Sequence, residues 1–246
     1  MATPTYLELA EGLAADFRLV GDRVPSENEI ASAHGISRPT ARAALQELER
    51  RFLVRRVRGA GTFVSRRIDY VISDSRPPSA SATLRAAGVE PVIELVEVQA
   101  LRCAADIAWH LGVERGTKVQ LIRRRTTIDG LLTSLSSSYI PTALVPGIVD
   151  ELALRGSLFQ TLRDVYGIES QRRWSRASLD LPPTSIVEAL RLDGTPPTCL
   201  LEGVNQRRDR PTQAVEFTRS WSRADVLNVV FEMGNPPEIV RTETVR

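Results

Sequence analysis

The segment 26–64 constrains the fold of this chain most strongly, because helix-starting and helix-ending residues follow one another within a few positions. Ser26 and Glu29 form an S-x-x-E capping box, in which each side chain binds an otherwise unpaired backbone N–H group. The helix that begins there is expected to end at Gly35, and Ser37 is placed to cap a second helix. Two short helices joined around a glycine predict a helix-turn-helix.

The second helix is expected over residues 38–50, and it combines an apolar stripe with a basic face. Pro39 is compatible with the first helical turn, whose N–H groups have no intrahelical partner. Arg38 and Arg42 lie near the N-terminal end, where recognition helices meet base edges and phosphates. The apolar stripe recurs at helical spacing and consists of Ala41, Ala44, Leu45 and Leu48.

A basic β-hairpin is expected after the second helix. Residues 52–57 are prone to form a strand, residues 58–61 (Arg-Gly-Ala-Gly) form a tight turn, and residues 62–64 return. Residues 36–67 hold nine arginines and two glutamates, a net charge of +7, whereas the whole chain has a net charge of +2. An Arg-rich helix alone is more often a solvated face, but this ordered set of signals indicates nucleic-acid binding.

Four motifs in this region resemble the DNA-binding domain of GntR-family bacterial transcription regulators. They are Tyr6-x-x-Leu-Ala, Gly21-Asp-x-Val-Pro-Ser-Glu, Ile36-Ser-Arg-Pro-Thr-Ala-Arg-Ala-Ala-Leu and Gly59-x-Gly-Thr-Phe-Val. Ala41 departs from the family pattern, which usually has valine there. The resemblance implies a winged helix-turn-helix that contacts DNA through Glu27, Asn28, Ser37, Arg38, Pro39, Thr40, Arg42, Arg58, Gly59, Gly61 and Thr62.

The composition is that of an ordinary globular protein, with 42% hydrophobic and 25% charged residues among 246. We find no apolar run long enough for a membrane span and no signal-peptide pattern at the N-terminus. Cys103 and Cys199 lack metal-ligand spacing and are expected to be buried thiols in a reducing cytosol. We therefore expect a bacterial cytoplasmic protein, nucleoid-associated when bound to DNA, with no metal and no cofactor.

The chain is expected to divide at a polar linker. Residues 1–67 would form the winged helix-turn-helix, residues 68–80 a linker that can include a short strand at residues 70–72, residues 81–235 an effector-binding and dimerisation domain, and residues 236–246 a flexible tail. Short helices alternate with strands after residue 81, including strands 119–128 and 131–140 joined at Asp129-Gly130, a strong hairpin signal. This pattern predicts an α+β domain on a largely antiparallel sheet.

The hairpin strands place polar groups where the sheet should be covered. Ile122 and Ile128 indicate that the strand face carrying Arg124 and Thr126 is buried. A buried arginine needs an anionic partner, so Arg124 either pairs with Glu216 in the core or binds an anionic ligand. The residues alone leave these two alternatives equal. On the partner strand, alternation places Leu132, Ser134, Ser136 and Ser138 along one face, and further along the chain Glu216, Thr218 and Ser220 share a face. A hydroxyl-lined surface beside an arginine suits a phosphate, sulfate, phosphonate or carboxylate, and Arg172 and Arg173 could close the pocket.

Residues 81–232 resemble the ligand-sensing (UTRA) domain of the HutC subfamily of GntR regulators, which has the chorismate-lyase fold. The resemblance lies in Gly116-Thr-x-Val, in Arg123-Arg-Arg with Asp129-Gly130, in Ser138-Tyr-Ile-Pro, in Tyr166-Gly and in the stretch from Glu216 to Asp225. It implies effector contacts from Arg124, Ser136, Glu216, Thr218 and Ser220, and the strand pattern adds Thr126, Ser138 and Arg172. The subfamily often has an acidic residue at position 136, so serine there favours an anionic effector.

Three shorter motifs are most similar to regulators of phosphonate uptake and degradation, the PhnF type. They are Ile68-Asp-Tyr, Leu84-Arg-Ala-Ala-Gly and Ser220-x-Ser-Arg-Ala-Asp. The expected function is a homodimeric repressor that leaves a near-palindromic double-stranded DNA operator when a small anionic effector binds. Regulation of amino sugar or histidine catabolism is an alternative within the subfamily.

Two other classes of function, an enzyme and an architectural DNA-binding protein, fit the sequence less well. A lyase-like enzyme would need catalytic groups, but we find no nucleophile–base pair, no metal cluster and only His34 and His110, which lie in different expected domains. A ligand-independent architectural DNA-binding protein would not need an interior lined by arginine and serine. We therefore expect no catalytic residues.

Overall fold

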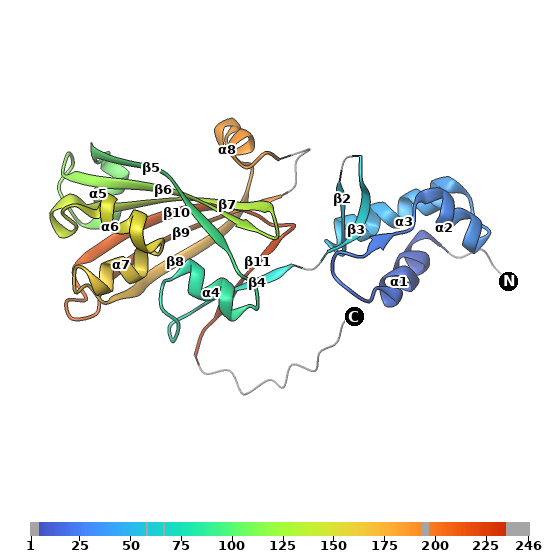
Figure 1. Ribbon diagram of the computed structural model, residues 1–246, viewed down its shortest axis with the longest axis horizontal. Coiled ribbons are helices and arrows are strands. Elements are labelled where there is room, and N and C mark those ends of the chain that lie inside the picture. The colour runs from blue at the N-terminus through green and yellow to red at the C-terminus, as the bar shows by residue number, and fades with distance from the viewer. Residues whose placement is uncertain (1–4, 58, 66, 193–196, 235–246) are drawn as a thin grey trace. The chain divides into compact units, whose positions relative to one another are not determined.

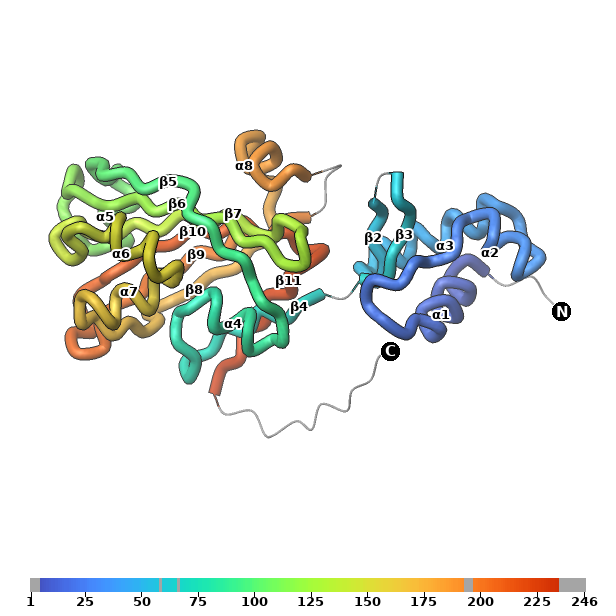
Figure 2. Tube along the Cα trace, in the orientation of Figure 1, coloured from blue at the N-terminus to red at the C-terminus, as the bar shows by residue number. Residues whose placement is uncertain are grey.

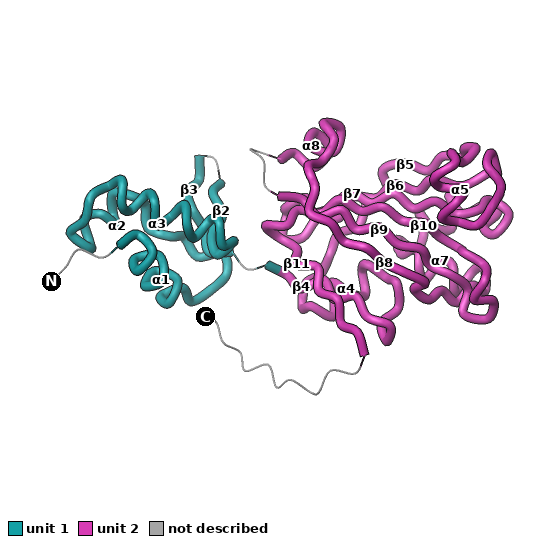
Figure 3. The backbone as a smooth tube through the Cα atoms, turned by 180° about the vertical axis from the view of Figure 1, so that it is seen from behind, with its two compact units in different colours: residues 1–67, 237–246 teal, residues 68–236 magenta. Residues whose placement is uncertain are grey.

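The computed structural model describes residues 5–57, 59–65, 67–192 and 197–234 (Figures 1 and 2). The described part falls into two compact units that meet in sequence between Arg67 and Ile68 (Figure 3). The expected tail, residues 236–246, lies outside the described residues. Within the described ranges, no helix is both long and apolar enough to cross a membrane.

The first unit is a winged helix-turn-helix. Its helices are α1 (Tyr6–Asp16), α2 (Glu27–His34) and α3 (Arg38–Arg50), and its small antiparallel sheet has the order β1 (Arg23–Val24), β3 (Gly61–Val64) and β2 (Val54–Val57). Both side chains of the capping box at Ser26 and Glu29 bind backbone N–H groups, and Gly35 ends α2 with a φ of 62°. The predicted helix-turn-helix is therefore confirmed.

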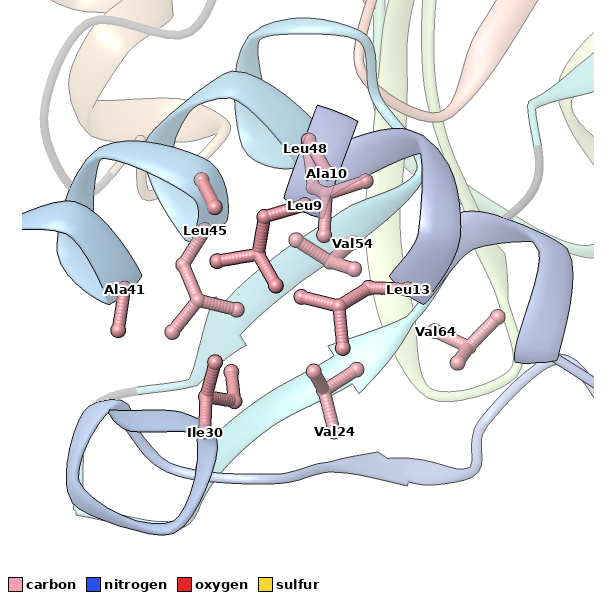
Figure 4. Packing of buried hydrophobic residues seen from close by; sticks show 11 residues of the cluster. Leu9, Ala10, Leu13, Val24, Ile30, Ala41, Leu45, Leu48, Val54 and Val64 are labelled. Atoms are coloured by element: carbon pink, nitrogen blue, oxygen red, sulfur yellow. The ribbon is translucent and has the colours of Figure 1, made fainter. Parts of the chain in front are cut away.

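Apolar side chains from all three helices and the sheet close around one core in this unit (Figure 4). Leu9 of α1, Ile30 of α2 and Leu48 of α3 are each at most 4% exposed. Burying a leucine or isoleucine side chain of this kind stabilises the fold by about 1.5–3 kcal/mol. Ala41 is fully buried, so the smaller residue at this position still belongs to the packed face of α3. The opposite face of α3 is left for solvent or a partner.

A six-stranded antiparallel sheet forms the centre of the second unit. Its order is β5 (Val92–Arg102), β6 (Lys118–Ile128), β7 (Leu131–Pro141), β10 (Ala214–Arg223), β9 (Thr198–Arg207) and β8 (Ser170–Asp180). Strands β6 and β7 meet at Asp129 and Gly130, whose φ angles of 50° and 73° are those of the expected two-residue hairpin turn. The prediction of an α+β domain on an antiparallel sheet is confirmed.

Helices cover both faces of this sheet. On one face, α6 (Ile148–Arg155) and α7 (Leu158–Asp164) pack on Ile122 and Ile140. On the other face, α5 (Ala105–Leu111) packs on Val119 and Phe217. The remaining helices are η1 (Thr142–Leu144), α4 (Ala80–Ala86) and α8 (Thr184–Ala189).

The structure differs from the sequence analysis at residues 68–80, which were expected to be a linker. Residues 68–73 form strand β4 (Ile68–Ser73), which pairs in parallel with β11 (Leu227–Glu232). Val71 and Ile72 are 4% exposed, so burial of apolar side chains holds this segment in the second unit. Ser79 then caps α4 by accepting a hydrogen bond from the backbone N–H of Ala82. The connection between the units is correspondingly short.

Candidate functional site

The exposed face of α3 carries the two arginines expected to read DNA. The side chains of Arg38 and Arg42 are 60% and 52% exposed. Ser37 caps the helix by accepting a hydrogen bond from the Thr40 backbone N–H, and the two hydroxyl oxygens lie 2.8 Å apart. These contacts fix the first turn of α3, whose positive dipole end favours phosphate groups. Pro39 is exposed in the same turn.

Glu27, at the start of α2, lies against these arginines. Its carboxylate accepts hydrogen bonds from Nε and Nη2 of Arg42, each at 3.1 Å, and from Nε of Arg38 at 3.2 Å. The hydrogen bond from Arg42 is the main reason that the pKa of Glu27 is below its usual value. Three of the residues expected at DNA are therefore in direct contact, and Asn28 is exposed beside them.

The wing forms a second part of this surface. Gly59 and Gly61 have φ angles of 77° and 124°, which favour glycine, and the hairpin tip between them is exposed. Arg58 lies outside the described residues. A shallow hollow at the tip is lined by Thr62 and the glycines and also by Arg23 and Arg56. Arg23 was not predicted at this surface, because the two-residue strand β1 leaves no periodic signal in the sequence.

In the second unit, strand register gathers the expected effector residues on one face of the sheet, which we call the pocket face. Arg124 of β6 pairs with Ser136 of β7, and Ser136 pairs with Ser220 of β10. Another row runs from Glu216 of β10 through Asn205 of β9 to Arg172 of β8. Antiparallel partners directly opposite one another have side chains on the same face.

A cavity of about 90 Å³ opens on the pocket face, well above the roughly 10–15 Å³ that a water molecule needs. Seven of the eight expected effector residues line it, namely Arg124, Thr126, Ser136, Arg172, Glu216, Thr218 and Ser220. Ser138 is not among the described lining residues. It is fully buried and accepts a hydrogen bond from Nη2 of Arg124 at 3.1 Å, so it supports the arginine from behind.

Two arginines in this cavity have buried N–H groups without a hydrogen-bond partner. They are Nε of Arg124 and both Nε and Nη2 of Arg172. Burial lowers the pKa of both guanidinium groups, and the negative charge of Glu216 opposes this shift at each of them. A buried charged donor that stays unpaired is unfavourable, commonly by about 1–3 kcal/mol or more.

Glu216 does not neutralise Arg124 directly. Its Oε2 accepts a hydrogen bond from Nδ2 of Asn205 at 2.7 Å, and both residues are buried. Among the described residues, no carboxylate oxygen lies within 4.0 Å of the Arg124 guanidinium nitrogens. Of the two alternatives left open for Arg124, the direct core ion pair with Glu216 is therefore not formed.

Several lining residues come from segments that the sequence analysis did not associate with a pocket. Tyr70 of β4, the N-cap residue Ser79 and Ser81 in the first turn of α4 belong to the stretch around the expected linker, and Asn205 lies on β9. Burial raises the pKa of the Tyr70 hydroxyl, whereas the positive charges of Arg172 and Arg124 lower it. Arg173, which was expected near Arg172, is exposed at a β-bulge and is absent from the described lining residues.

The two histidines lie in different units of the chain. His34 is exposed at the end of α2. His110 of α5 stacks on Phe217 with ring centroids 4.1 Å apart, on the sheet face opposite the cavity. Within the described ranges, no group of three or more His, Cys, Asp or Glu side chains is arranged to bind a metal ion.

Comparison with known proteins gives matches over both units. Residues 5–64 match the model of bacterial regulatory proteins of the gntR family, and residues 86–228 match the UTRA domain. The HTH-type transcriptional regulator GgaR of Escherichia coli K12 is 30% identical over 94% of this chain and 91% of its own length. The HTH-type transcriptional repressor PhnF of Mycolicibacterium smegmatis is 30% identical over 87% of this chain and 85% of its own length.

A crystal structure of PhnF from Mycobacterium smegmatis resembles this chain over the same two parts. The TM-score is 0.64 at 29% sequence identity, and the match covers 95% of this chain and 100% of that structure. The match therefore includes both the winged helix-turn-helix and the unit that holds the cavity.

Proposed function

This chain belongs to the GntR family of bacterial regulatory proteins and carries a UTRA domain of the HutC type, and from that premise we propose that it is a repressor released from its operator by a small anion. Its relatives are named as transcription regulators, and the chain is a DNA-binding regulator rather than an enzyme. We infer repression, as opposed to activation, from the similar PhnF protein of Mycolicibacterium smegmatis, which is named as a transcriptional repressor.

The observation that carries the anionic effector is the pair of buried arginines in the cavity. Arg124 and Arg172 together hold three buried N–H-bearing nitrogens without partners. The nearby carboxylate of Glu216 is engaged by Asn205. A phosphate, phosphonate or carboxylate would supply the missing acceptors and one or two negative charges. The hydroxyls of Ser136, Thr126, Thr218 and Ser220 would add hydrogen bonds around it.

For the DNA half, we propose that two copies of the chain bind one near-palindromic duplex as a homodimer. Each copy would insert the N-terminal end of α3 into the major groove, with Arg38 and Arg42 at base edges. The tip of the wing, at Gly59 and Gly61, would lie close to the phosphate backbone. The protein would act in the bacterial cytoplasm and lie on the nucleoid while it is bound to DNA.

We further propose that the regulated genes serve phosphonate uptake or degradation. Support comes from the motifs shared with the PhnF type and from the anion-binding character of the cavity. Amino sugar and histidine catabolism are the other candidate pathways in the subfamily, and they predict different ligands. A phosphorylated amino sugar carries an additional amine, and an imidazole carboxylate carries a ring.

Thermal unfolding of the full chain tests this proposal. A ligand that binds only the folded state raises the melting temperature, and the shift grows with ligand concentration. We expect phosphate or alkylphosphonates to stabilise the wild type but not Arg124→Met or Arg172→Met. Arg123→Met is the matched control, because Arg123 lies next in sequence, points to the other face of the sheet and pairs with Glu97.

Each outcome separates one part of the proposal from the rest. Stabilisation only by an amino sugar phosphate or an imidazole carboxylate would exclude the phosphonate pathway. Equal stabilisation of wild type and Arg124→Met by every anion would show that the cavity is not the effector site. Neither result would affect the assignment of DNA binding to the first unit.

A further inference from the structure

The carboxylate of Glu27 occupies one particular edge of the Arg42 guanidinium. Nε and Nη2 of Arg42 donate to Oε1 and Oε2 of Glu27, which is a two-point contact along the side-on edge. Arg38 donates to the same carboxylate through Nε alone. The side chain of Glu27 is only 18% exposed, whereas the two arginines remain more than half exposed.

In the part of the chain that the structure describes, the outer edges of both guanidinium groups make no other hydrogen bond. A guanidinium has five N–H donors in a fixed planar arrangement, and Glu27 uses two of those on Arg42 and one on Arg38. The end-on edge, formed by Nη1 and Nη2, can donate two parallel hydrogen bonds to O6 and N7 of guanine in the major groove. Glu27 therefore restrains each arginine while leaving its base-reading edge available.

A carboxylate in this position does not favour binding to the DNA backbone. Its negative charge repels the phosphates of DNA, and it cancels part of the positive charge of Arg38 and Arg42. Its contribution to DNA binding must then come from geometry. Long arginine side chains lose rotamer freedom when they bind, and an arginine that is already restrained loses less.

We propose that Glu27 is a positioning residue for base readout, which holds Arg38 and Arg42 so that the protein discriminates its operator from other DNA. This inference rests on the proposed DNA contacts of those two arginines. Glu27 thereby increases the ratio of specific to non-specific affinity, even though its charge opposes non-specific binding. It does not itself contact a base.

The test uses full-length protein and two duplexes. One is the duplex that the wild-type protein enriches from a random-sequence pool, and the other is a scrambled duplex of the same base composition. Glu27→Gln and Glu27→Ala are compared with Glu11→Gln. The control removes one negative charge from the same unit, at a 67% exposed side chain on α1 that lies 3.8 Å from Arg51.

We expect both Glu27 variants to lose about tenfold or more in affinity for the enriched duplex, the scale of one well-placed arginine–guanine contact. Their affinity for the scrambled duplex should stay equal or rise, because a negative charge is gone. Glu11→Gln should leave the ratio of the two affinities unchanged. Melting temperatures close to wild type would show that the change does not arise from unfolding.

The proposal is overturned if the Glu27 variants keep the wild-type ratio of affinities, or bind both duplexes more tightly by the same factor. Either result would make Glu27 a simple neutralising charge. The variant Arg42→Ala tests separately whether α3 contacts DNA at all. If that variant binds the enriched duplex as well as wild type does, the proposed DNA contacts of α3 are wrong. The proposed role of Glu27 is then wrong as well, because it depends on those contacts.

Discussion

Glu47 of α3 is a buried carboxylate that two arginines of its own helix hold in the charged form. It accepts hydrogen bonds from Nε and Nη2 of Arg50 at 2.8 and 2.7 Å and from Nε of Arg51 at 2.7 Å. These bonds, led by those from Arg50, lower its pKa from 4.5 to about 2. The contact joins the last turn of α3 to its C-cap residue Arg51, so it stabilises the C-terminal end of this helix.

The depressed pKa of Glu47 makes part of the stability dependent on pH. The folded state keeps this carboxylate ionised at pH values where the unfolded chain already binds a proton. Its stabilising contribution is fully present above pH 4.5 and is lost as the pH falls toward about 2. We expect urea midpoints of the full chain to fall between pH 5 and pH 3, and Glu47→Gln to have a lower midpoint at pH 7 and a weaker pH dependence. An unchanged pH dependence in Glu47→Gln, with Glu11→Gln as control, would contradict this.

At the scale of elements, Gly203 of β9 is placed where the neighbouring strand β8 approaches closely. A Cβ atom at this position would lie 2.9 Å from the carbonyl oxygen of Trp174 and 3.1 Å from the hydroxyl of Ser175. Backbone cannot yield as a flexible side chain does, so a methyl group must displace one strand. The bulge in β8 between Arg172 and Trp174 is at the same place, and the cavity borders it.

We therefore expect Gly203→Ala to destabilise the protein by about 1–3 kcal/mol, the usual effect of overpacking. Gly12→Ala is the matched control. No atom lies within 4 Å of a Cβ at Gly12, which is in the interior of α1, so alanine should stabilise by about 0.5–1 kcal/mol there. Urea unfolding of both variants measures the two changes. A neutral Gly203→Ala would mean that β8 and β9 separate more easily than their register implies.

The elements that the sequence predicted well are those with local signals. The capping residues predicted the starts of α2 and α3, and the Asp129-Gly130 pair predicted the β6–β7 hairpin. Pairing of β4 with β11 has no local signal, because it joins residues as distant as Asp69 and Asn228. For the same reason Tyr70 was missed as a pocket residue.

Alternation along strands likewise predicted part of the cavity. It placed Arg124, Thr126 and Ser136 on a covered face, because the period of a strand is two residues. It was wrong for Leu132, since a register irregularity next to Thr126 and Thr127 separates Leu132 from Ser134. Alternation also cannot predict the hydrogen bond between Asn205 and Glu216. That contact depends on the pairing of β9 with β10 and on the bulge between Ala214 and Glu216.

At the scale of the whole molecule, the chain connects the DNA-reading unit directly to the wall of the cavity. Strand β4 begins at Ile68, where the second unit starts, and its Tyr70 lines the cavity with Arg124 and Arg172. An anion bound by these arginines would therefore touch the strand that follows the first unit in sequence. An effector at this place would be only a few residues along the chain from the first unit.

If the effector weakens operator binding by some factor, operator DNA must weaken effector binding by the same factor, because the two equilibria share one cycle. We expect that factor to lie between about 5 and 150, the usual range for coupled sites.

Titration calorimetry of the stabilising anion, with and without saturating enriched duplex, gives one side of the cycle. Duplex titrations with and without saturating anion give the other. Arg172→Met should remove both effects while leaving duplex affinity in the absence of anion unchanged. If the anion affinity were independent of DNA, the cavity would not regulate DNA binding. A ligand with equal affinity for the DNA-bound and the free protein cannot shift their populations.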